Sequence, residues 1–226
     1  MLSLLQRIPS LWIALIVGVI GSNLYLRYLA PKSAENDFVR DRVFTIVLLF
    51  ILFSRFSGVI LHPSANIRGD LLSLLSGSSS SGWIVGLIAS LFYALVSVWR
   101  AKRMNQPTLF LFAEALCSGS IVFFAFQSYV NLNPFRMEDI LRMIGSGVLV
   151  WLIRKHRTRL MLRAQWIWGG YGLLLLLTST YVPHVNSTLF LTTPQWMSVL
   201  LMVIAAYVEG KYDLNEKHHI TSRHGR

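Results

Sequence analysis

Residues 140–163 read ILRMIGSGVLVWLIRKHRTRLMLR, an apolar run that passes directly into a strongly basic segment. Seven such apolar runs alternate with loops, and they cover residues 11–29, 43–61, 83–98, 109–130, 140–153, 166–182 and 189–208. A helix needs about 20 mainly apolar residues, within a range of about 17–25, to cross the core of a bilayer. The run 140–153 is short for this purpose, and 189–208 reaches full length only by including Pro194. The pattern predicts an all-α integral membrane protein with seven transmembrane helices.

Positive charge sets the number and direction of the predicted crossings. Most of the 21 Lys and Arg residues fall in alternate loops and in the tail. These residues are Arg27, Lys32, Arg40 and Arg42 in the first loop, Arg100, Lys102 and Arg103 in the third, Arg154, Lys155, Arg157, Arg159 and Arg163 in the fifth, and Lys211, Lys217, Arg223 and Arg226 in the tail. Basic residues that flank membrane helices stay on the cytoplasmic side. We therefore expect the N-terminus outside and the C-terminus in the cytoplasm. Omitting the run 140–153 would put two basic loops on opposite faces.

Composition supports a membrane protein without a separate soluble domain. The chain is 54% hydrophobic and 14% charged, and its mean hydropathy is positive; these values are typical of membrane proteins. We expect one seven-helix domain at 1–210, with an amphipathic outer loop at 62–81, and a basic cytoplasmic tail at 211–226. The net charge of +11 is spread over loop ends, which favours contact with anionic lipid over nucleic acid. The histidines of the tail have no fixed ligand geometry, so neither a metal nor a cofactor is predicted.

Polar residues inside apolar runs are costly, and they often mark a functional site. On the predicted topology, Arg55, the segment 79–82, and Gln127 with Asn131 all lie near the outer leaflet. Small residues at helix ends are also common packing residues or N-caps, and Gln127 can join helices. Arg55 can snorkel outward, pair with a carbonyl group or hold a lipid phosphate. Glu114 is expected to face the cytoplasmic interface without a special role.

Four short motifs, in this order, resemble those of a known family. They are SRF at 54–56 with VIL at 59–61, SSGWIVG at 80–86, EAL at 114–116 with the segment running to Asn131, and QWMS at 195–198. They are similar to A-R-L-x-x-V-L-F, S-x-H-G-G-L-x-G, a segment ending in G-R-x-G-N-F, and Q-W-x-S. The chain thus resembles the bacterial prolipoprotein diacylglyceryl transferases over most of its length.

The resemblance implies a reaction and a set of site residues. The family transfers diacylglycerol from phosphatidylglycerol to the lipobox cysteine of a prolipoprotein and releases glycerol phosphate. It implies lipid-binding roles for Arg55, Gly82, Gln127 and Asn131, the signal segment of a prolipoprotein as partner, and the bacterial plasma membrane as location. The family's catalytic positions are changed: Ser81 replaces the histidine, Ser128 and Leu175 replace arginines, and Ser179 replaces the glutamate that follows Tyr171-Gly172 in the pattern Y-G-x-x-R-F-x-x-E.

Three hypotheses remain open at this stage. The chain is a divergent diacylglyceryl transferase with a rebuilt site, or a catalytically inert relative that binds phospholipid or a lipoprotein or membrane partner. A small-solute transporter is the third, but the sequence has no internal repeat and no chain of ionisable residues through the apolar runs.

Overall fold

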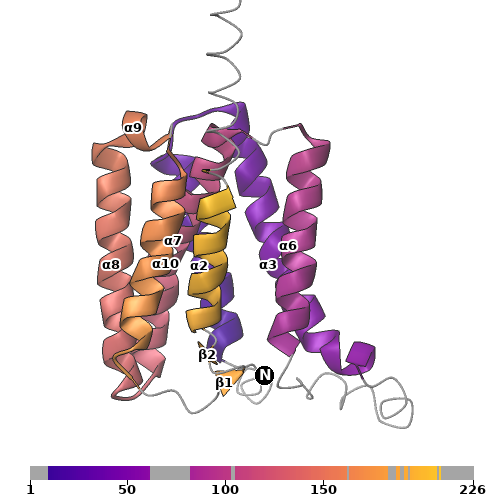
Figure 1. The fold of residues 1–226 in the computed structure, drawn as a ribbon, viewed down its shortest axis with the longest axis vertical. Coiled ribbons are helices and arrows are strands. Elements are labelled where there is room, and N and C mark those ends of the chain that lie inside the picture. The colour runs from indigo at the N-terminus through magenta and orange to yellow at the C-terminus, as the bar shows by residue number, and fades with distance from the viewer. Residues whose placement is uncertain are drawn as a thin grey trace, which may run out of the picture. The chain divides into compact units, whose positions relative to one another are not determined.

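The computed structural model describes residues 10–61, 82–102, 105–161, 163–182, 187–188, 191–192, 194–207 and 209. The predicted outer loop at 62–81, which includes Ser81, and the predicted tail at 211–226 lie outside the described residues. Figure 1 shows the helices, which are α2 (Ser10–Tyr28), α3 (Ala34–Leu61), α6 (Gly82–Arg100), α7 (Gln106–Val130), α8 (Phe135–Lys155), α9 (Arg157–Met161), α10 (Gln165–Ser179) and the unlabelled helix Pro194–Tyr207. Strands β1 (Ser187–Thr188) and β2 (Leu191–Thr192) form one short antiparallel pair.

The described chain is helical apart from this pair, and each predicted apolar run contains a helix. By length and composition, α2, α6 and α7 can cross a membrane. The predicted run 189–208 starts too early, because β2 occupies part of it and the helix begins at Pro194. Proline lacks a backbone N–H and has a fixed φ, so it is well suited to the first turn of a helix.

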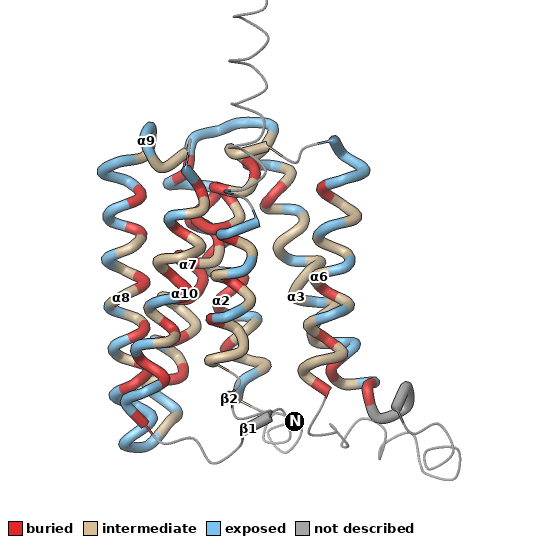
Figure 2. The backbone as a smooth tube through the Cα atoms, in the orientation of Figure 1, coloured by how far each residue is buried: buried red, intermediate tan, exposed pale blue. Residues whose placement is uncertain are grey.

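The chain divides into two compact units. Unit 1 consists of Met1–Leu29 and Asn105–Arg226, and it holds α2, α7, α8, α9, α10, the strand pair and the helix Pro194–Tyr207. Unit 2 consists of Ala30–Met104, and it holds the antiparallel helices α3 and α6. Figure 2 shows that both units contain helices along which buried and exposed residues alternate, as expected for helices that pack with one face against their neighbours.

In unit 2, small residues allow α3 and α6 to approach closely. Gly82, Gly86 and Ser90 follow one another at four-residue intervals on α6, and all three are buried. A Cβ atom on Gly86 would lie 2.6 Å from the carbonyl oxygen of Phe50, and one on Gly82 would lie 2.6 Å from that of Ser54. Such small-residue seams are typical of helices that pack within membranes.

A methyl group at the seam should destabilise unit 2. We expect Gly86→Ala to lower the unfolding temperature of the full-length protein in detergent, because overpacking costs about 1–3 kcal/mol. Gly147→Ala is the matched control, since a Cβ on Gly147 of α8 would meet nothing within 4 Å. Equal unfolding temperatures for the two variants would contradict this packing.

Candidate functional site

Helix α7 is the central helix of unit 1. It packs against α2, α8 and α10. The side chain of Asn105 caps its first turn by accepting a hydrogen bond from the backbone N–H of Thr108, at 3.0 Å. Along its length α7 carries buried polar residues as well as apolar ones, among them Glu114, Ser120 and Gln127. Such groups are stable in a packed interior only when they find partners. Two clusters of polar side chains lie along α7, one near each end.

The first cluster, the Glu114 cluster, consists of Tyr25, Glu114 and Arg157. The carboxylate of Glu114 is fully buried at 0% exposure. Arg157 donates to both of its oxygens, from Nη1 to Oε1 at 2.6 Å and from Nη2 to Oε2 at 2.9 Å. The hydroxyl of Tyr25 donates to Oε1 at 2.9 Å, and the guanidinium lies 5.1 Å from the centroid of the Phe110 ring.

The geometry of this cluster is that of a structural clamp. Two parallel N–H···O bonds make a strong, directional arginine–carboxylate pair, and it joins α2, α7 and α9. The expectation that Glu114 faces the cytoplasmic interface without a role is therefore wrong. The reason is tertiary: α9 folds across the end of α7 and supplies an arginine that lies 43 residues away in sequence.

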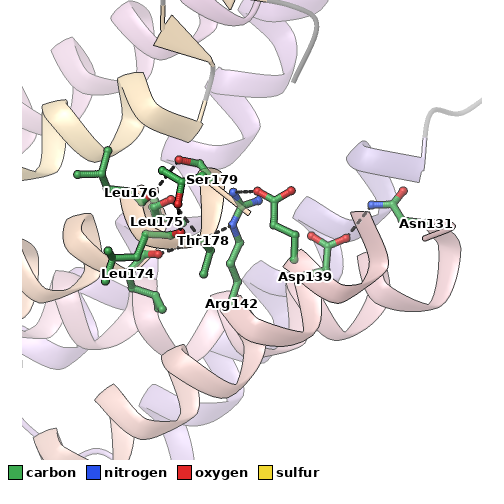
Figure 3. A network of polar contacts seen from close by, with 11 residues as sticks. Asn131, Asp139, Arg142, Leu174, Leu175, Leu176, Thr178 and Ser179 are labelled. Atoms are coloured by element: carbon green, nitrogen blue, oxygen red, sulfur yellow. Dashed lines mark hydrogen bonds and ion pairs between the residues drawn. The ribbon is translucent and has the colours of Figure 1, made fainter. Parts of the chain in front are cut away.

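The second cluster, the Arg142 cluster, consists of Asn131, Glu138, Asp139, Arg142 and Thr178, and Figure 3 shows it from close by. Arg142 is 7% exposed and Glu138 is 2% exposed. Arg142 donates from Nη2 to Oε1 of Glu138 and from Nε to Oγ1 of Thr178, the latter at 3.0 Å. Its guanidinium also lies 5.6 Å from the centroid of the Phe124 ring.

Asn131 joins the end of α7 to the start of α8. As the C-cap of α7, it donates its backbone N–H to the carbonyl of Gln127 at 2.8 Å. Its side-chain Nδ2 donates to Oδ2 of Asp139 at 2.7 Å, and Asp139 is buried. The amide of this predicted lipid-binding residue is thus already engaged within the protein.

The hydroxyls at two of the family's catalytic positions bond to their own helices. Ser128 donates to the carbonyl of Ala125 and Ser179 to that of Leu176, each at 2.8 Å. Leu175 is a buried apolar side chain on α10. The other predicted residues are placed as follows: Gln127 is buried on α7 in unit 1, whereas Arg55 is half-buried on α3 and Gly82 is buried on α6, both in unit 2.

Two charged residues that the sequence pattern did not single out, Glu138 and Arg142, lie beside the predicted site positions on α10. Thr178, which bonds to Arg142, lies between Leu175 and Ser179 on α10. The pair Glu138 and Arg142 is the missed feature. Its sequence signal is the spacing of four residues, which places opposite charges one above the other on a helix.

Besides the two clusters, one polar contact joins α7 to α10 within the bundle. The hydroxyls of Tyr171 and Ser120 form a hydrogen bond, and both residues are buried. Ser146, one turn beyond Arg142 on α8, is fully buried, and its Oγ has no partner among the described residues. The polar face of α8 therefore continues inward from the Arg142 cluster.

These features define a helical protein with apolar helices suited to a membrane and a buried charged cluster at one end of a helix bundle. No group of three metal-ligating side chains occurs among the residues that the structure describes. No family model, no curated protein and no solved structure matches the chain.

Removing one partner of the Glu114 cluster should be strongly destabilising. We expect Arg157→Gln to lower the free energy of unfolding by about 3–5 kcal/mol, because it leaves the buried carboxylate of Glu114 unpaired. Glu114→Gln should cost less, because the side chain of Arg157 is 25% exposed and its guanidinium can still be hydrated. The double variant should lose much less than the sum, since the two side chains interact directly. Unfolding in detergent micelles with increasing dodecyl sulfate measures this. The control is Arg159→Gln, because Arg159 is an exposed residue of the same helix as Arg157. Strictly additive losses in the double variant would contradict a direct interaction between Glu114 and Arg157.

Proposed function

We propose that the protein is a multi-pass protein of the bacterial plasma membrane with seven crossings, its N-terminus outside and its C-terminus in the cytoplasm. The charge distribution of the loops and the helix found in every apolar run support this. Stripes of large exposed apolar residues on the helices also support a membrane location. On α6, Ile88, Phe92, Leu95 and Trp99 are 57–73% exposed and share one face. Surfaces of this kind are stable against lipid and unfavourable in water.

We further propose that the protein binds anionic phospholipid of the phosphatidylglycerol type and that Arg142 contacts the lipid phosphate. The observation that carries this proposal is the guanidinium of Arg142, a residue that is 7% exposed and lies in the same cluster as the predicted lipid-binding residue Asn131 (Figure 3). Guanidinium groups bind phosphate through charge-assisted hydrogen bonds. On the proposed topology the Arg142 cluster lies toward the outer leaflet, where the headgroup of such a lipid would be found.

Diacylglyceryl transfer of the conventional kind is not expected. The family reaction needs positive charge on the leaving glycerol phosphate and a group that removes the proton of the cysteine thiol. Ser128, Leu175 and Ser179 supply neither, and the two serine hydroxyls are bonded to helix carbonyls. Loss of one electrostatic stabiliser costs about 10²–10³ in rate, and loss of a general base costs a similar factor. We therefore propose a phospholipid-binding relative of the transferases rather than an active one.

One observation favours a second candidate, a transferase with a rebuilt site. The Arg142–Glu138 pair of α8 lies beside the positions on α10 where the family has its own arginine and glutamate. In that case Arg142 would stabilise the phosphate as the C–O bond breaks, and Glu138 would take the thiol proton as the S–C bond forms. The prolipoprotein signal segment would then be the second partner.

Native mass spectrometry of the purified protein with phosphatidylglycerol tests the phosphate contact. We expect Arg142→Gln to weaken lipid binding by about tenfold or more, because a charge-assisted bond contributes about 1.5–3 kcal/mol. Arg136 is an exposed residue of the same helix, and the variant Arg136→Gln should bind the lipid like the unchanged protein. The double variant with Glu138→Gln and Arg142→Gln removes both members of the ion pair, and its unfolding temperature, measured beside its lipid binding, separates lost binding from lost folding. Unchanged binding by both Arg142 variants would overturn the proposal.

The same samples decide between the two candidates when a lipobox peptide is added. We expect no diacylglyceryl adduct on the peptide cysteine, while an intact family member forms one. An adduct that disappears in Arg142→Gln would establish the rebuilt transferase in place of the inert relative.

A further inference from the structure

The segment that joins α8 to α10 carries unbalanced positive charge. No acidic residue occurs in the sequence between Asp139 and Glu209. Two of the arginines in this interval are neutralised from elsewhere, Arg142 by Glu138 and Arg157 by Glu114. The remaining basic residues are exposed and form no ion pair with any described residue: Arg154, Lys155, Arg159 and Arg163. We call these four side chains the α9 surface.

The α9 surface is held in place by buried contacts rather than by its own short helix. Arg157, in the middle of the segment, reaches inward to Glu114. The backbone N–H of Ala164 donates to Oε1 of Gln106 at 3.2 Å, and the indole of Trp168 donates to the carbonyl of Leu109 at 3.2 Å. The segment is therefore anchored to α7 at the first residue of α9 and again after α9, and its other basic side chains are exposed.

The surface also has a shallow open hollow and the aromatic neighbours expected at a lipid headgroup. A hollow of about 300 Å³ lies where α8 passes into α9, lined by Lys155, His156, Thr158 and Arg159. This volume is at the lower end of the range for small-molecule sites, about 300–1,000 Å³. Trp151 and Trp166 are 57% and 63% exposed, and the ammonium of Lys155 lies 4.9 Å from the centroid of the Trp151 ring. Tryptophan is enriched at the interface between lipid and water.

We propose that the α9 surface is a binding site for the phosphate headgroup of an anionic phospholipid in the surrounding bilayer. Charge complementarity and the flanking tryptophans support a membrane lipid as the occupant, since a soluble anion would use the charges but not the aromatic residues. Figure 1 shows α9 at the end of unit 1 opposite to the strand pair. The site is about 20 Å from Arg142 along α8, at about 1.5 Å per residue. It rests on the proposed membrane location but not on the proposed contact of Arg142 with phosphate.

Lipid titration followed by native mass spectrometry tests this site in the full-length protein. A variant with Arg154, Lys155, Arg159 and Arg163 all changed to Gln should bind phosphatidylglycerol at least about tenfold more weakly, because it removes charge-assisted hydrogen bonds to the headgroup phosphate that contribute about 1.5–3 kcal/mol each. Binding of phosphatidylcholine should not change. The matched control changes four exposed basic residues of other loops to Gln: Arg27, Lys32, Arg100 and Lys102. It should lose less than about twofold.

A second variant keeps the test independent of folding. Arg154→Lys, Arg159→Lys and Arg163→Lys together keep the charge, so this variant should retain most of the binding. An equal loss in the Gln variant and its control would overturn the proposal in favour of general attraction. Displacement of the lipid by inorganic phosphate would overturn it in favour of a free-anion site, and displacement by an oligonucleotide in favour of a nucleic-acid surface.

Discussion

The buried ion pair between Glu114 and Arg157 is the interaction on which the rest of unit 1 depends. A carboxylate with no solvent exposure is unstable unless a cation and hydrogen-bond donors saturate its oxygens, and here Arg157 and Tyr25 do so. Meeting this requirement fixes α2 and α9 against α7. The segment between α8 and α10 is thereby held against α7.

The two ends of unit 1 use charge in opposite ways. At the Arg142 cluster, two carboxylates face one guanidinium, and every member is buried or joins two helices. At the α9 surface, four cations are exposed and form no ion pair with a described residue, while Glu114 is paired with Arg157. Between these ends the helices are held together by apolar packing and by the hydrogen bond between the hydroxyls of Tyr171 and Ser120. A bundle with polar ends and an apolar exterior is what a bilayer requires, because its core supplies no hydrogen-bond partners.

The helices were predictable from the sequence because apolar runs and proline are local signals. The start of the last helix at Pro194 and the seam of Gly82 and Gly86 follow from single-residue chemistry. The pairing of Glu138 with Arg142 was also within reach, since it needs only a spacing of four residues. The burial of Glu114 was not, because its partner lies 43 residues away and arrives through the fold of α9. Likewise, nothing local to Asn131 indicates that its amide is engaged by Asp139. The roles expected for Glu114 and Asn131 were based on their depth in the membrane alone. The structure changes these roles because both side chains bond to partners within the protein.

The central claim is that α8 crosses the membrane and separates the Arg142 cluster from the α9 surface. Labelling of single cysteines with a membrane-impermeant maleimide tests it most directly. Cys117 is fully buried and is the only cysteine in the chain, so Cys117→Ala gives a clean background for Asn133→Cys before α8 and Thr158→Cys in α9. Both positions are exposed. The account predicts that Asn133→Cys is labelled from outside in intact spheroplasts and Thr158→Cys only in inverted vesicles. Labelling of both from the same side would contradict it.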